Sequence, residues 1–203
     1  MDDDDRYIPC WGPMFSRGTA ARAELATDLA IPLVAEGGWQ AVTLRSVARA
    51  ANVTPQAIAA WFPSVAVMRV AIAECYGRRW MSERRAVAHR RMLKATADAE
   101  DVPLVEPQLR KVAIALLPGT WLEETFDGVW LTVVEAGRWD EAIGASVAAV
   151  QEDERDLVAE LLDDPEDEGD VDLVLTLVRG LRAARVAQRG DVTSRSAGRT
   201  SAR

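Results

Sequence analysis

Apolar residues recur along most of the chain at the three- and four-residue spacing of an α-helix, and no stretch shows the strict alternation of a half-buried strand. In the first such segment, Leu25, Leu29 and Leu33 share one helical face. A Gly-Gly pair then favours the end of the helix, and Pro32 is expected to kink it or to end it early. The pattern predicts an all-α protein with helices at 19–36, 43–51, 55–61, 65–97, 103–117, 121–139, 140–162 and 171–189.

Two of the short helices carry clear capping signals. Thr43 precedes one helix and Thr54 the next, and both can accept a hydrogen bond from an N–H of the first turn. Asn52 lies in the turn between them, and asparagine is the commonest residue besides glycine in a left-handed backbone conformation. Ile58 is placed to fill the space between the two helices. Residues 43–62 therefore match a helix-turn-helix, a pattern that many helical hairpins share.

The distribution of charge decides which partners this motif can have. The formal net charge of −8 argues against a polyanion as partner. Residues 16–94, however, hold twelve basic and five acidic residues, whereas residues 95–203 hold eleven basic and twenty-three acidic ones. Electrostatic attraction is local, within about 10 Å at moderate salt. A basic first half therefore keeps DNA as a candidate partner, and the basic residues of the long helix are expected to pair mainly with the acidic half.

The composition excludes several other classes of protein. A chain of 203 residues with 49% hydrophobic residues can bury a sizeable core. No apolar run is long enough for a membrane span, and the acidic start is unlike a signal peptide, so a cytoplasmic protein is expected. Two cysteines, Cys10 and Cys75, and one histidine, His89, give little material for a metal site. No nucleotide-binding or catalytic motif is present, so no enzyme, no cofactor and no metal are expected.

The segment around the helix-turn-helix resembles the N-terminal domain of the TetR family of bacterial transcriptional regulators. The resemblance covers about residues 20–76 and includes the Gly-Gly break and the run Trp61-Phe62-Pro63-Ser64. More loosely, residues 177–182 look like the family's last helix, which forms the dimer. The resemblance implies a homodimer that binds a palindromic operator in double-stranded DNA, in the bacterial cytoplasm at the nucleoid. It also implies a repressor that is released when a small hydrophobic effector binds the helical C-terminal domain.

Family positions carried over one by one give candidate DNA-binding residues at the start of the second helix and on the recognition helix: Thr43, Arg45, Thr54, Pro55, Gln56, Ala60 and Trp61. Two positions depart from the family pattern, because Ala59 stands where a tyrosine is usual and Val65 where a basic residue is usual. Both usual residues anchor the DNA backbone. The alternative is therefore a TetR-like dimer that has lost specific DNA binding and acts as a ligand-binding or protein-interaction module.

Composition predicts a flexible arm (1–16) and a disordered tail (190–203), and the resemblance divides the chain between them into a helix-turn-helix domain (17–64) and an effector-binding and dimerisation domain (65–189). Apolar stripes on 140–162 and 171–189 exceed what one helical pair can bury, which favours a four-helix dimer seam. The aromatic residues of the C-terminal domain either form core or line an effector pocket. The candidate pocket residues are Trp80, Trp121, Phe126 and Trp130.

Overall fold

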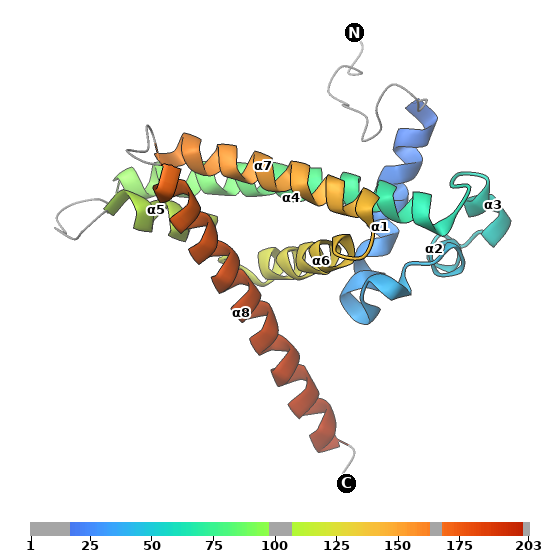
Figure 1. The fold of residues 1–203 in the computed structure, drawn as a ribbon. Coiled ribbons are helices and arrows are strands. Elements are labelled where there is room, and N and C mark those ends of the chain that lie inside the picture. Colours follow the sequence, from blue (N-terminus) through green and yellow to red (C-terminus); the bar gives the residue numbers. More distant parts are fainter. Residues whose placement is uncertain (1–16, 98–106, 163–167, 201–203) are drawn as a thin grey trace. The chain divides into compact units, whose positions relative to one another are not determined.

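The structure is a computed structural model that describes residues 17–97, 107–162 and 168–200. The predicted arm at 1–16, Cys10 and residues 201–203 of the predicted tail lie outside the described residues. Every regular element of the described residues is helical, which confirms the all-α prediction (Figure 1). The elements are α1 (Arg17–Gly37), the 3-10 turn η1 (Trp39–Ala41), α2 (Leu44–Ala50), α3 (Pro55–Ala59), α4 (Val65–Ala97), α5 (Pro107–Leu116), α6 (Trp121–Gly137), α7 (Glu141–Leu162) and α8 (Glu168–Thr200).

Most helix boundaries lie close to the predicted ones, with two differences. Helix α1 continues through Pro32 to Gly37, so the expectation that Pro32 ends it early is wrong. Pro32 and Asp28 are both exposed, and the Asp28 carbonyl that a proline leaves without its helical donor can therefore be solvated. Helix α8 extends to Thr200, whereas the composition suggested that it ends at Arg189.

The described chain divides into two compact units, and the division falls within α4, α6 and α7. The first unit contains residues 17–79 and 132–149, so the beginning of α4 belongs with the helix-turn-helix; the sequence suggested a boundary at residue 64. Within it, α2 packs against both α1 and α3. Its core contains buried apolar side chains from these helices, from the turn after α3 and from the start of α4, among them Ala26, Ala30, Val34, Val47, Ile58, Phe62 and Met68.

Two contacts fix the outer elements of the first unit. The Arg69 side chain on α4 donates from Nε to the Val42 carbonyl at 2.9 Å, which ties the long helix to the segment before α2. At the other end, α6 and α7 approach closely: a Cβ on Gly144 would lie only 2.8 Å from the Gly137 carbonyl oxygen. Glycine at Gly144 is therefore required by packing.

The second unit contains the described residues of 80–131 and 150–203, in which α5 packs against α8. Its core mixes apolar side chains with three buried charged residues, Asp127, Glu154 and Arg182. Charged groups are almost never fully buried unless they are paired, and all three of these are paired. This ionic cluster lies beside the cavity described below.

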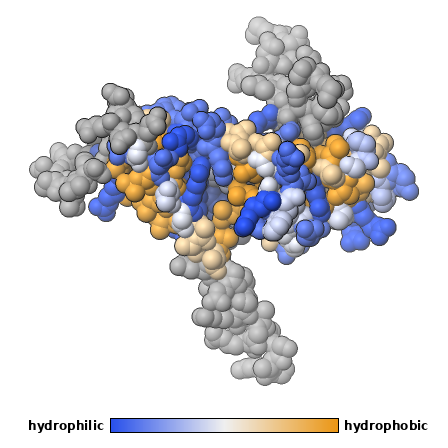
Figure 2. All heavy atoms as spheres, in the orientation of Figure 1, coloured by the Kyte–Doolittle hydropathy of each residue, from blue (hydrophilic) through white to orange (hydrophobic). Residues whose placement is uncertain are grey.

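Helix α8 has one buried face and one exposed apolar face. Val174, Val178 and Arg182 are buried on one face. The adjacent face is apolar and exposed, with Leu173, Leu177 and Leu181 at intervals of one helical turn. In Figure 2, hydrophobic side chains gather over α5 and the first part of α8. Leu173, Leu177 and Leu181 line a groove of about 290 Å³ together with residues of the α5 segment, which are Leu109, Ala113, Ile114 and Leu117.

The apolar stripe expected on 140–162 has a different place from that on α8. Its members are buried within the chain: Ile143, Val147, Val150, Leu157 and Leu161. The exposed face of α7 is instead small and acidic, with Ala145, Ala149, Glu152 and Asp156 along it. The expected four-helix seam therefore loses its α7 stripe, because those side chains already form the core of the monomer.

Candidate DNA-binding surface and ligand cavity

The start of α2 is held by a reciprocal pair of hydrogen bonds. The Ser46 N–H donates to Thr43 Oγ1 at 3.0 Å, and the Thr43 N–H donates to Ser46 Oγ at 2.9 Å. The Ser46 hydroxyl also donates to the Ala41 carbonyl at 2.6 Å. This capping box satisfies donors that the first helical turn leaves free. The Thr43 hydroxyl is thus engaged in the cap.

The turn between α2 and α3 follows the sequence prediction. Asn52 has φ 54°, a left-handed conformation. The Ala57 N–H donates to Thr54 Oγ1 at 3.3 Å, and Pro55 occupies the first turn of α3, where a missing N–H costs nothing. Ile58 is fully buried and locks α3 against the rest of the first unit. The prediction of a helix-turn-helix at residues 43–62 is therefore confirmed.

The residues that this motif leaves exposed form the candidate DNA-binding surface. Arg45, Thr54, Pro55, Gln56 and Ala60 are all exposed. Trp61 is half-buried, and the guanidinium carbon of Arg22 on α1 lies 5.8 Å from its ring centroid. A cation over an indole face is attracted by the ring quadrupole. Trp61 is therefore placed at the edge of the surface, next to α1.

Two further arginines, Arg49 and Arg22, belong to this surface and were not predicted from the sequence. Arg49 is exposed one helical turn after Arg45 on α2, and this spacing could have identified it. Arg22 is also exposed. It lies far from Trp61 in the sequence, so no local sequence pattern indicates their contact. Within the described residues, neither Arg45 nor Arg49 forms an ion pair, so both charges can act on an external anion.

The structure describes both positions that depart from the family pattern, Ala59 and Val65. Ala59 is exposed at the end of α3, and Val65 is half-buried at the first position of α4. Ser64 precedes it and caps α4, because the Val67 N–H donates to Ser64 Oγ at 3.2 Å. The nearest basic residue of α4, Arg69, is occupied by backbone carbonyls. The basic contribution to this surface therefore comes from α1 and α2.

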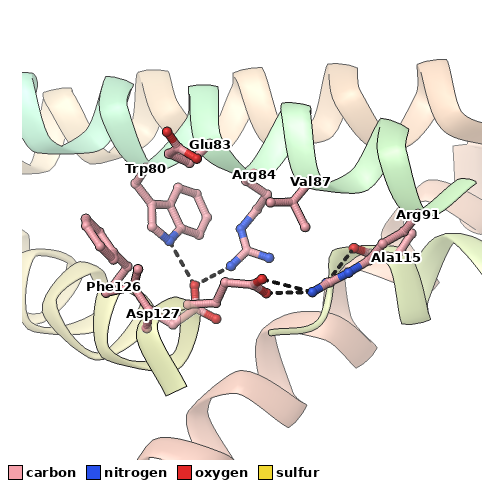
Figure 3. Close-up of a pocket in the computed structure, with 10 residues that line it drawn as sticks. Trp80, Glu83, Arg84, Val87, Arg91, Ala115, Phe126 and Asp127 are labelled. Atoms are coloured by element: carbon pink, nitrogen blue, oxygen red, sulfur yellow. Dashed lines mark hydrogen bonds and ion pairs between the residues drawn. The ribbon is translucent and has the colours of Figure 1, made fainter. Parts of the chain in front are cut away.

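A cavity of about 260 Å³ lies in the second unit between α4, α6 and the end of α5 (Figure 3). Its walls combine apolar side chains with five that are charged. The lining residues are Trp80, Glu83, Arg84, Val87, Arg91, Ala115, Leu122, Glu123, Phe126 and Asp127. Pockets of this kind, mostly apolar with a few convergent polar groups, are typical of small-molecule sites.

The charged groups of the cavity wall are held by hydrogen bonds from several elements. Trp80 Nε1 donates to Asp127 Oδ1 at 2.9 Å, and Arg84 Nη2 pairs with the same oxygen. Arg91 Nη2 donates to both oxygens of Glu123, at 2.7 and 3.0 Å. The Gly119 N–H donates to Glu123 as well, at 2.8 Å. Burial alone would raise the pKa of Glu123, but these donors hold it below the ordinary value.

Behind the cavity the ionic cluster continues onto α7 and α8. Arg182 Nη1 pairs with Glu154 at 2.5 Å, and Arg179 Nε pairs with the other oxygen of Glu154 at 2.9 Å. Burial alone would raise the pKa of Glu154, but the two arginines reverse this and lower it. Arg182 Nη2 also donates to the Leu116 carbonyl at 3.0 Å. The cluster thus joins α5, α7 and α8 at the back of the cavity.

The four aromatic residues selected from the sequence have different places. Trp80 and Phe126 line the cavity. Trp130 is buried and stacks on Trp80, with ring centroids 5.0 Å apart. Trp121 is 68% exposed and is not among the lining residues. Arg84, Arg91, Glu123 and Asp127 were not predicted to line a pocket, because charged residues in an amphipathic pattern are normally assigned to the solvent face.

Neither a membrane span nor a metal site is found in the part of the chain that the structure describes. None of the described helices is both long and apolar enough to cross a membrane. Within the same part of the chain, no group of three or more His, Cys, Asp or Glu side chains is placed to hold a metal ion.

The comparisons with known proteins agree with the fold. No protein-family model matches the chain, and no curated protein sequence matches it. Among solved structures, the fold is similar to the crystal structure of a transcriptional regulator from Rhodococcus sp. Rha1. The TM-score is 0.60 and the sequence identity 18%, over 83% of this chain and 85% of that chain. At this identity the similarity establishes a shared fold.

Proposed function

We propose that this protein is a TetR-like transcriptional repressor that binds a palindromic operator as a homodimer and is released by a small hydrophobic effector. The observation that carries the proposal is the helix-turn-helix of the first unit. Its second helix is capped and pinned by buried Ile58, and it leaves Thr54 and Gln56 exposed at its N-terminal end. In this motif, those positions are the ones that meet base edges in the major groove.

The chemistry of the exposed residues supports two kinds of DNA contact. Arg45, Arg49 and Arg22 are basic and exposed, and arginine contacts to phosphate supply most of the affinity that is independent of sequence. Gln56 can form paired hydrogen bonds with adenine, and the side chains of Thr54 and Ala60 can contact thymine methyl groups. Sequence would be read by α3, while α1 and α2 supply the attraction to the backbone.

The exposed apolar face of α8 supports a dimer. Leu173, Leu177 and Leu181 together with Ile114 on α5 form a continuous apolar surface. Such a surface in a globular protein marks an interaction site. Gly180 lies on the same face, and nothing within 4 Å would meet a Cβ there, which leaves room for close helix approach. A second copy related by a two-fold axis would cover α8 with α8, and a palindromic operator has the matching symmetry.

The cavity of the second unit supports the effector part of the proposal. It is enclosed mainly by apolar side chains and is separate in the chain from the helix-turn-helix. Helix α4 runs from the first unit into the second and carries Trp80, Arg84 and Arg91 of the cavity wall. A ligand that favours one position of α4 would therefore also bias the helix-turn-helix attached to its other end.

Selection of bound fragments from random duplex DNA with the full-length protein tests the proposal. The expected result is enrichment of an inverted repeat whose half-sites are about 10 base pairs apart, centre to centre, or a multiple of that spacing. Recovery of fragments without a shared sequence at low salt would contradict the operator reading. The dimer that lacks specific DNA binding would then be the better account, since Ala59 and Val65 supply neither of the usual backbone anchors.

A further inference from the structure

The exposed surface of α3 and of the segments around it carries no charge. Residues 53–68, from the turn before α3 to the first turn of α4, include no acidic or basic residue. Only Thr54, Gln56 and Ser64 are polar among the exposed residues of this stretch. The other exposed residues present methyl and methylene groups, and these are Val53, Pro55, Ala59, Ala60, Pro63 and Ala66. This surface is therefore uncharged and mainly apolar.

The polar groups of this surface are few, and two of the three form helix caps. Thr54 Oγ1 accepts the Ala57 N–H at 3.3 Å, and Ser64 Oγ accepts the Val67 N–H at 3.2 Å. Gln56 is exposed, and its amide both donates and accepts, so that it can form two hydrogen bonds with a single base. Adenine presents the matching acceptor and donor, N7 and N6, in the major groove.

The residue types that read G·C pairs are absent from this surface. Guanine is read chiefly by arginine or lysine, which donate to O6 and N7, and cytosine by aspartate or glutamate, which accept from N4. Residues 53–68 contain none of these four types. The next basic residue along α4, Arg69, donates to two backbone carbonyls. Arg45 and Arg49 are on α2, and the first helix of this motif crosses the DNA backbone.

The apolar groups of the surface have one kind of apolar partner on the base edges of the major groove. This partner is the C5 methyl group of thymine, whereas a G·C pair presents N7, O6 and N4. An alanine or valine side chain against those polar atoms would remove them from water without a replacement hydrogen bond, which costs free energy. Against a thymine methyl group, the same side chain buries apolar surface and displaces no hydrogen bond. Both the amide of Gln56 and the apolar groups therefore favour A·T pairs.

We propose that α3 reads a run of A·T pairs in each half-site of the operator, with Gln56 on adenine and apolar side chains, including Ala60, on thymine methyl groups. This inference rests on the proposed binding of operator DNA and names the base pairs that are read. The exposed arginines outside α3 attract phosphates and add no requirement for guanine. In Figure 1, α2 and α3 lie side by side, so both kinds of contact can form on one stretch of duplex.

Base analogues test the methyl contacts without any change to the protein. The duplex is the inverted repeat that the full-length protein selects from random DNA, and A·T pairs are expected at matching positions of both half-sites. Fluorescence anisotropy compares this duplex with one in which the thymines at those positions are replaced by uracil, which lacks only the methyl group. Binding is expected to weaken by about fourfold for each methyl group that α3 contacts. Uracil in place of a thymine outside the half-sites is the matched control and should leave binding unchanged.

Gln56→Arg tests the role of Gln56 through a change of preference. Arginine reads guanine where glutamine reads adenine, so this variant is expected to select guanine in place of one adenine in each half-site. Gln40→Arg is the matched control, because Gln40 is exposed in η1, outside α3, and the substitution adds the same charge. The control variant should keep the sequence preference of the wild type, even where the added charge strengthens binding to every duplex.

The outcomes separate this inference from the proposed function. An inverted repeat with half-sites of G·C pairs, or one that binds equally well with uracil, would overturn the assignment of A·T pairs and leave operator binding standing. An unchanged preference in Gln56→Arg would overturn the placement of Gln56 on adenine. Fragments without a shared sequence would overturn operator binding and this inference together.

Discussion

Arg182→Met is expected to destabilise the second unit strongly. The Arg182 side chain is 4% exposed and donates to Glu154 at 2.5 Å and to the Leu116 carbonyl at 3.0 Å. Its removal leaves the carboxylate of Glu154, itself almost fully buried, with Arg179 as its remaining partner. Removing one member of a buried ion pair costs about 3–5 kcal/mol, because the other charge stays buried.

The structure places the expected cost at the lower end of that range. Arg179 still neutralises Glu154, and Arg84 still donates to the Leu116 carbonyl, so neither group is left entirely without a partner. A loss of about 3 kcal/mol follows, against a total stability of about 5–15 kcal/mol for a typical folded protein. In a protein of this size, the corresponding fall in melting temperature is about 6–12 °C.

The assay is urea unfolding followed by circular dichroism and by tryptophan emission, since the guanidinium carbons of Arg84 and Arg182 lie 4.6 and 5.2 Å from the Trp80 ring centroid and this indole reports on the cluster. The matched control is Arg155→Met, because Arg155 pairs with Asp172 and so connects the same two helices, α7 and α8, at the surface. An exposed pair of this kind contributes little to stability. The double variant Arg182→Met/Glu154→Leu should recover most of the stability, because apolar side chains of similar volume can replace a buried pair.

Two results would contradict the predicted effect of Arg182→Met on stability. A cost for Arg182→Met no larger than that for Arg155→Met would mean that the ionic cluster does not hold α7 and α8 together. A double variant as unstable as the single one would mean that the loss comes from packing of the long side chain, and not from the unpaired charge on Glu154.

Three further outcomes are expected. Arg182 and Arg179 overcome the effect of burial and lower the pKa of Glu154; its contribution to stability is therefore complete above the ordinary glutamate pKa of about 4.3 and is lost as the pH falls through the lowered value. Glu154→Gln should flatten the acid limb of a stability-against-pH curve, and an unchanged limb would contradict the assignment. Leu177→Asp should convert the proposed dimer to a monomer in sedimentation at micromolar concentration, whereas Ala183→Asp, exposed on α8 outside the leucine stripe, should not; a Leu177→Asp protein that remains dimeric would move the seam elsewhere. Val65→Lys should strengthen binding to every duplex and steepen the salt dependence by about one unit, while the dipole of α4 lowers stability by a few tenths of a kcal/mol; an unchanged slope would show that this position does not reach a phosphate.

The short-range features of the fold were predictable because their causes are local. The caps at Thr43 and Thr54 and the left-handed Asn52 depend on a few neighbouring residues, and the structure has all three. The start of α4 at Val65 follows from the proline and serine before it. Pro32 was misjudged because the cost of a proline depends on whether the carbonyl it leaves free is solvated, and that depends on tertiary structure.

The cavity was only partly predictable, since its polar groups depend on tertiary pairing. Hydrophobic periodicity assigns Arg84, Asp127 and Arg182 to solvent, yet less than a tenth of each side chain is exposed, because the three neutralise one another across helices. Of the basic run on α4, Arg84, Arg85 and Arg91 do pair with acids of the second half of the chain, as the charge distribution suggested, but Arg79 pairs with Glu24 and Asp28 of α1. Aromatic residues were equally ambiguous, because composition does not show which face is covered: Trp130 is buried and Trp121 is exposed.

In the proposed mode of binding, α3 reads the DNA sequence while α2 supplies phosphate attraction, and these two roles can be separated by the effects of two substitutions. Fluorescence anisotropy would compare the wild type, Arg45→Ala and Gln56→Ala on the selected duplex and on a scrambled one, over a series of salt concentrations. Arg45→Ala should weaken binding to both duplexes and reduce the salt slope by about one unit. Gln56→Ala should lose about 1–3 kcal/mol on the selected duplex alone. Equal losses by both variants on both duplexes would contradict the account.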